Sequence, residues 1–189
     1  MAGGSKDRAK HTAARGVKKP TRQQLMSEIP DPADMPAYLK MLHFEADDRG
    51  CAIMGGGLVE HYLTQAIKCR LIDPGAKLAG EWFTGPSAPF STFSAKIQLG
   101  MAIGIYGPLM HGRLNAIKDV RNVFAHRALP LTFDHPTLLE SILKLAPFLK
   151  GSKEDNYKLV YATGCVAMGD ALIQDAAAHS GRDMETTYP

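Results

Sequence analysis

The stretch Pro108-Leu-Met-His-Gly-Arg-Leu-Asn-Ala-Ile-Lys-Asp-Val-Arg-Asn-Val-Phe-Ala-His126 decides the fold class of this chain. At about 100° per residue, most of its apolar side chains fall on one arc, which predicts an amphipathic helix closed off by Pro130. The core-facing arc comprises Leu109, Met110, Leu114, Ile117, Val120, Val123 and Phe124. A helix with one apolar face needs partner helices to cover it, so the stretch favours a helical bundle.

Helical periodicity recurs on both sides of this stretch, whereas strand patterns are nearly absent. Residues 35–48 and 49–72 are expected to be helical, and the second helix has an apolar face made of Ala52, Val59, Leu63, Ala66, Ile67 and Leu71. Further helices are expected from Ser91 or Thr92 to about Tyr106, over 138–145 with Asp134 or Thr137 as the cap, and over 156–179. The chain is therefore predicted to be all-α, a single helical bundle of about five to six helices over residues 31–189.

A loop is expected between the second and third of these helices. Asp73-Pro-Gly75 is a helix-stop sequence, and turn residues continue over 74–89. Trp82 and Phe83 lie within this segment, and we expect them to fold inward as a lid over the core.

The formal charge of +3 is unevenly distributed. Residues 1–30 hold seven cations against two anions, a net +5, which leaves −2 for the remainder. With few apolar residues this segment is predicted to be a disordered tail, acting either as a solubilising extension or as a loose electrostatic contact with nucleic acid. The seven cations are Lys6, Arg8, Lys10, Arg15, Lys18, Lys19 and Arg22.

Several classes of protein are not expected. The chain shows no secretory signal and no apolar run long enough to span a bilayer, so we expect a cytoplasmic protein without a membrane partner. Its three cysteines form no Cys-x-x-Cys pair, and its seven histidines lack the spacing of metal ligands. We therefore predict no structural metal and no cofactor.

Two charged side chains lie on apolar faces of predicted helices. Arg121 projects from the middle of the arc described above, and Glu60 lies inside the apolar arc of the 49–72 helix. A lone buried charge is strongly disfavoured, so each needs a partner. We predict an ion pair between Glu60 and Arg121, with Asp48 and Glu45 as competing acids. A carboxylate–guanidinium separation above about 6 Å would exclude it.

Two further features of these helices allow more than one interpretation. Gly55-Gly-Gly57 lies inside a helical pattern, where each glycine costs about 1 kcal/mol relative to alanine, and predicts either close helix–helix approach or a kink. Asn122 and His126 are expected on the outer, polar face, opposite Arg121. His126 is either a helix-end residue placed favourably against the helix dipole or a functional group.

Three blocks of sequence resemble the mannitol operon repressor family and occur in the same order. They are Glu45-Ala-Asp-Asp-Arg-Gly-Cys-Ala52 with Leu58-Val-Glu60, then Gly85-Pro-Ser-Ala-Pro-Phe-Ser-Thr-Phe-Ser-Ala-Lys-Ile97, then Ala116-Ile-Lys-Asp-Val-Arg-Asn-Val-Phe-Ala-His126. This resemblance implies an all-helical fold and a role in regulating transcription through a protein or nucleic-acid partner. The basic tail and the glycine run depart from the family pattern.

The element Arg121-Asn-Val-Phe-Ala-His126 is also similar to the signature of the HEPN domains (higher-eukaryote-and-prokaryote nucleotide-binding), many of which are metal-independent ribonucleases with sites composed across a dimer. The resemblance implies that Arg121 holds the scissile phosphate, His126 transfers a proton and Asn122 orients either of them. An arginine fork and a histidine that titrates near neutrality suit this chemistry.

Three functions therefore remain open from the sequence. The leading one is a non-enzymatic regulator, expected to be a homodimer. Its alternative is a metal-independent endoribonuclease that uses Arg121, Asn122 and His126. The third is a dimeric helical scaffold with a basic arm.

Overall fold

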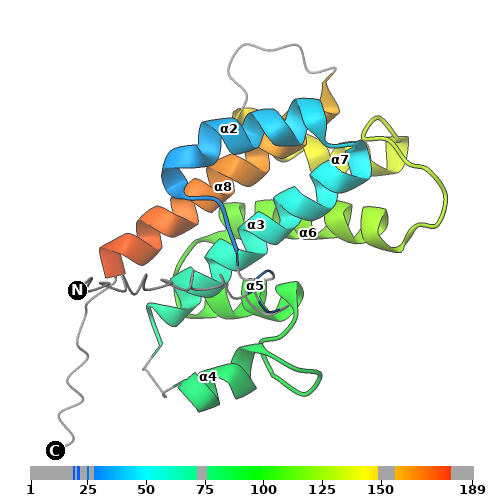
Figure 1. Cartoon of the computed structure of the whole chain (residues 1–189). Coiled ribbons are helices and arrows are strands. Elements are labelled where there is room, and N and C mark those ends of the chain that lie inside the picture. Colours follow the sequence, from blue (N-terminus) through cyan, green and yellow to red (C-terminus); the bar gives the residue numbers. More distant parts are fainter. Residues whose placement is uncertain are drawn as a thin grey trace, which may run out of the picture.

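The fold consists of helices packed around one long central helix (Figure 1). The computed structural model describes residues 28–71, 76–148 and 156–179, together with Lys19, Thr21 and Leu25. Within these residues every regular element is helical and none is a strand, which confirms the predicted all-α class. Most of the predicted tail lies outside the described residues, as does the predicted helix stop at Asp73-Pro-Gly75.

The described helices follow one another along the chain with short connections. They are a 3-10 turn (Pro32–Asp34), α2 (Met35–Lys40), a π-helical turn (Met41–Glu45), α3 (Asp48–Lys68), α4 (Ala76–Phe83), α5 (Phe93–Ala102), α6 (Pro108–His126), α7 (Pro136–Leu143), a second 3-10 turn (Ala146–Phe148) and α8 (Tyr157–His179). No helix in this described part is both long and apolar enough to cross a membrane.

Helix α3 lies at the centre and packs most extensively against α8, then against α6 and α5 (Figure 1). The apolar face predicted for it is buried, except that Leu71 beyond its end is only partly covered. Tyr161 of α8 is fully buried where three helices meet; its hydroxyl donates to the carbonyl oxygen of Ala52 (3.0 Å) and lies 3.4 Å from that of Ile117. This tyrosine therefore joins α3, α6 and α8 in the core.

Close contact between α3 and α8 depends on Gly55. A Cβ at this position would lie 3.1 Å from Cys165 Sγ and 3.3 Å from Tyr161 Cε1. The close helix–helix approach predicted from the glycine run is therefore present. Cys165 and Cys51 are fully buried free thiols, whereas the free thiol of Cys69 is only partly buried.

Helix α6 has the bounds predicted from its sequence, but its buried face is narrower than predicted. Leu114, Ile117, Val120 and Phe124 are buried as expected. Leu109 is 70% exposed and Val123 is 38% exposed, so their assignment to the core was wrong. The predicted seven-residue arc is wider than the face that the neighbouring helices cover.

The predicted loop over 74–89 is wrong for its first half, because residues 76–83 form α4. The run Ala76-Lys-Leu-Ala consists of strong helix formers, and these outweigh the turn residues on either side. Phe83 packs against the core, with Lys68 Nζ 5.4 Å from its ring centre, whereas Trp82 is partly exposed. Of the two residues predicted to fold over the core, Phe83 does so, and it belongs to a short helix and not to a loop.

Local contacts set the remaining boundaries. Helix α5 ends at Ala102, before the predicted Tyr106, because Gly104 adopts a φ of +73° that ends the helix. Asp47 caps α3 through a 2.6 Å hydrogen bond from the Gly50 backbone N–H, which separates α3 from the preceding π-helical turn. Helix α7 is capped by His135, not by either predicted residue.

Candidate functional site

Arg121 lies at the contact between α6 and α3. A Cβ at Gly56 would lie 2.7 Å from Arg121 Cγ and 2.9 Å from Arg121 Cβ, so only a glycine lets the arginine stem pass at this distance. The side chain retains 32% of its exposure. Arg121 is therefore half-buried, with its stem held against α3 and its guanidinium partly open to solvent.

Glu60 of α3 faces two cations. Its Oε2 atom lies 3.9 Å from Arg121 Nη2, so the two residues predicted to pair lie within the limit of about 6 Å that was set for them. Its Oε1 atom accepts a 2.8 Å hydrogen bond from Lys96 Nζ. The nearer partner of Glu60 is therefore Lys96, which the sequence reasoning missed.

The competing acids have other surroundings. Asp48 accepts a 3.1 Å hydrogen bond from the Phe133 backbone N–H and lies 3.8 Å from Lys158 Nζ. Glu45 is exposed at the end of the π-helical turn. Neither of them makes a hydrogen bond or ion pair with Arg121 among the described residues.

Lys96 occupies the buried face of α5. Phe93, Ile97 and Gly100 share that face, and Lys96 is 8% exposed. The spacing of this stripe was visible in the sequence, since positions 93, 96, 97 and 100 fall on one side of a helix. Lys96 is therefore a third charged residue on an apolar helix face, the same feature that singled out Glu60 and Arg121.

The guanidinium of Arg121 is under-used as a donor. Its Nη1 atom donates to Asn122 Oδ1 at 3.1 Å, and its 3.9 Å separation from Glu60 is too long for a hydrogen bond. Its Nε atom is buried without a hydrogen-bond partner in the described part of the chain. Because a guanidinium carries five N–H donors, most of its hydrogen-bonding capacity is unused among the described residues.

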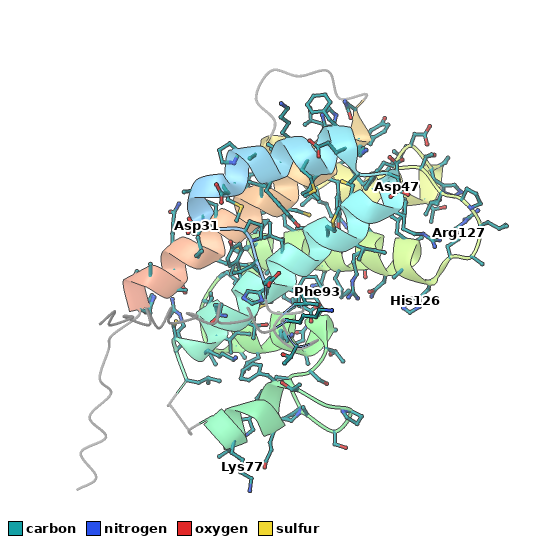
Figure 2. The ribbon with its side chains drawn as sticks, in the orientation of Figure 1. Asp31, Asp47, Lys77, Phe93, His126 and Arg127 are labelled. Carbon is teal, nitrogen blue, oxygen red and sulfur yellow. The ribbon has the colours of Figure 1, made fainter. Side chains whose placement is uncertain are left out.

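Asn122 and His126 do not share an environment. Asn122 is partly buried and contacts Arg121, so its predicted separation from Arg121 was wrong. His126 is exposed at the last turn of α6, and Figure 2 shows it projecting outward beside Arg127. The structure therefore brings Arg121 and Asn122 together and leaves His126 apart.

Charge near the site also affects His61, which follows Glu60 on α3. Burial, and then the nearby charges of Lys68 and Lys96, lower the pKa of His61 below its usual value of 6.5. The ring is therefore predominantly neutral at pH 7 and adds no further cation here. Its Nε2 atom lies 3.1 Å from Gln65 Nε2.

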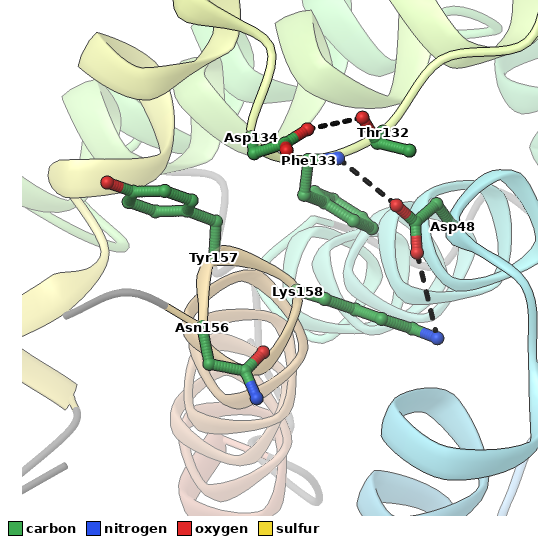
Figure 3. Close-up of a pocket in the computed structure, with 7 residues that line it drawn as sticks. All are labelled: Asp48, Thr132, Phe133, Asp134, Asn156, Tyr157 and Lys158. Carbon is green, nitrogen blue, oxygen red and sulfur yellow. Dashed lines mark hydrogen bonds and ion pairs between the residues drawn. The ribbon is translucent and has the colours of Figure 1, made fainter. Parts of the chain in front are cut away.

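A separate open pocket of about 520 Å³ lies where α3, the 132–134 turn and α8 meet (Figure 3). The polar groups in its wall largely bond to one another, since Asp48 holds the Phe133 N–H and faces Lys158, and Thr132 donates to Asp134. Lys158 also donates to the Ala46 carbonyl oxygen at 2.5 Å. These contacts join the starts of α3 and α8.

The remaining predicted site residues are the tail cations. Lys19 is exposed, and the other six lie outside the described residues. Comparisons of the chain with protein-family models, with curated proteins and with solved structures gave no match.

Proposed function

We propose that this chain is a non-enzymatic regulatory module, of the kind implied by its resemblance to the mannitol operon repressor family, which binds a nucleic-acid partner through Arg121. The observation that carries the proposal is the state of this side chain. The side chain is 32% exposed, and its guanidinium makes one hydrogen bond within the described residues. Such a group suits the phosphate oxygens of a nucleic acid.

Binding is favoured over cleavage because His126 is badly placed relative to Arg121. Five residues along a helix correspond to a rotation of about 140° and a rise of about 7.5 Å. A general base must lie within hydrogen-bond reach of the group from which it takes a proton. Arg121 is turned toward α3, whereas His126 is exposed at the helix end, so one chain does not present both groups to one phosphate.

The metal-independent endoribonuclease is the second candidate, and the same unused guanidinium favours it. In a homodimer, a second subunit would have to supply its His126 opposite Arg121 and Asn122. That arrangement would build the site from two chains. The two candidates differ in whether bound RNA is cut.

One experiment separates these functions. The full-length chain is incubated in chelator with fluorescein-labelled single-stranded RNA of mixed sequence, and anisotropy and strand length are followed together. We expect binding without cleavage, and we expect Arg121→Gln to weaken binding by about tenfold or more. Cleavage that is lost in His126→Ala would establish the nuclease instead. Absence of RNA binding by the wild-type chain would overturn both and leave a regulatory protein partner.

Arg113→Gln is the matched control for the loss of one positive charge. Arg113 lies on the same helix, but its guanidinium stacks 4.6 Å from the centre of the Phe148 ring and its Nε donates to the Lys144 carbonyl oxygen at 3.3 Å. We expect this variant to bind RNA within about threefold of wild type. Equal losses in the two variants would argue against a specific role of Arg121.

The basic tail is proposed to add a sequence-independent contact. Removing residues 1–30 deletes a net charge of +5 and should make RNA binding less dependent on salt concentration. An unchanged salt dependence would contradict this role.

A further inference from the structure

We propose that Lys96 is a positioning residue that keeps Arg121 available to an anionic partner. It does so by holding the Glu60 carboxylate, which would otherwise pair with the arginine. This inference rests on the proposed binding of nucleic acid by Arg121, and it adds a means by which the fold keeps that group free.

The distances place Glu60 with Lys96. Lys96 Nζ lies 2.8 Å from Glu60 Oε1, which is a full charge-assisted hydrogen bond. Arg121 Nη2 lies 3.9 Å from Glu60 Oε2, which is an ion pair without a hydrogen bond. The Glu60 carboxylate therefore accepts a hydrogen bond from Lys96 and makes only a longer-range ion pair with Arg121.

Burial explains why the lysine keeps its partner. The Lys96 side chain is 10% exposed and that of Arg121 is 32% exposed. A buried ammonium needs a nearby carboxylate, whereas a half-exposed guanidinium is also stabilised by water. Phe93 and Ile97 are buried on either side of Lys96 and fix the part of α5 from which it projects. Glu60 is thus held on the α5 side of the site.

Removing the lysine charge would change this arrangement. The Glu60 carboxylate, 19% exposed, would then have Arg121 as its near cation. A small rotation would bring it into bidentate contact with the guanidinium, which is the strongest arrangement these groups form. Arg121 would be neutralised by its own chain, and an RNA phosphate would have to displace a carboxylate.

The test measures binding of the same labelled RNA by full-length variants, with circular dichroism as a check of helix content. Lys96→Gln should weaken binding about tenfold, and Lys96→Arg, which keeps the charge, should bind like wild type. Lys118→Gln is the matched control, because Lys118 bonds to Asn115 and Asp119 on α6 and not to Glu60. It should weaken binding by less than about threefold.

A double-mutant cycle separates this mechanism from simple loss of charge. Glu60→Gln should change binding little in the wild-type chain but should restore it about tenfold in the Lys96→Gln background. Equal effects of Glu60→Gln in both backgrounds would overturn the proposal while leaving RNA binding by Arg121 in place. If wild type does not bind RNA, both proposals fail.

If Lys96→Gln alone does not fold, the double variant still tests the proposal against direct RNA contact by Lys96. The double variant with Glu60→Gln and Lys96→Gln removes both buried charges and should bind at least as tightly as wild type. A tenfold loss in this double variant would mean that Lys96 contacts the RNA directly, and would overturn its assignment as a positioning residue.

Discussion

Two neighbouring glycines in α3 have opposite surroundings. A Cβ at Gly56 would collide with the stem of Arg121, whereas a Cβ at Gly57 would meet no atom within 4 Å. The sequence shows both as the same feature, a glycine inside a helix. Which of the two glycines packing requires depends on where α6 crosses α3. The sequence around the glycines does not predict that crossing point.

Gly56→Ala is expected to destabilise the protein. Overpacking costs about 1–3 kcal/mol, and the gain in helix propensity returns about 1 kcal/mol of it. The added methyl group would contact Arg121 Cβ and Cγ, at the base of the side chain. Relieving this contact would displace the whole Arg121 side chain, so RNA binding should weaken too. The free energy of unfolding in urea measures the effect on stability.

Gly57→Ala is the matched comparison and should stabilise the chain by up to about 1 kcal/mol, since it adds helix propensity without a clash. If both alanine variants had the same stability, the proximity of Arg121 to Gly56 would not be a constraint on the fold.

At the scale of the helices, local signals in the sequence predicted more than tertiary ones did. The bounds of α6 were predictable because Pro108 starts it and its apolar residues recur at helical spacing. The start of α3 and the end of α5 each depend on a single residue, the Asp47 cap and Gly104 with its φ of +73°. Helix α4 was missed because turn residues surround a short run of helix formers.

In the candidate site, too, some contacts were predictable from helical spacing and others were not. Helical spacing was enough to predict that Glu60 and Arg121 face each other. Helical spacing also places Lys96 on the apolar stripe of α5, but which of the two cations lies nearer to Glu60 depends on how α5 and α6 pack beside α3. The contact of Asn122 with Arg121 depends on side-chain conformations that helical spacing leaves open.

The cap of α3 gives a prediction at this scale. Asp47 Oδ1 accepts a hydrogen bond from the Gly50 N–H, so Asp47→Ala should cost about 1 kcal/mol of stability, measured by thermal unfolding. Asp34 precedes α2 without a side-chain cap bond, and Asp34→Ala should change stability by less than about 0.5 kcal/mol. Equal losses in the two variants would show that the loss of a carboxylate, and not of a cap, is responsible.

Across the whole molecule, several groups that ionise in alkaline solution are buried in the core or packed against it. Burial raises the pKa of the Cys51 thiol from 9.0 to about 12, although the charge of nearby Lys158 opposes the shift. Burial also raises the pKa of Tyr38 to about 12 and that of Tyr161 well above its usual range. The folded chain keeps these protons at a pH where the unfolded chain has released them.

Stability should therefore fall as the pH rises above about 9. Between pH 9.0 and about 12 the unfolded state binds fewer protons through Cys51 than the folded state does, so each pH unit removes about 1.4 kcal/mol for this group. Cys51→Ala should reduce the slope of unfolding free energy against pH in this window. A wild-type slope in Cys51→Ala would contradict the prediction.

The burial of two of the three thiols also has a practical consequence. A maleimide reagent should attach to the native chain at Cys69 and spare Cys51 and Cys165, because only Cys69 is partly accessible. The chain thus already carries a single attachment point for a fluorophore at the carboxyl end of α3, without any engineered cysteine. Energy transfer from that position to a labelled RNA would report where on the molecule the RNA lies.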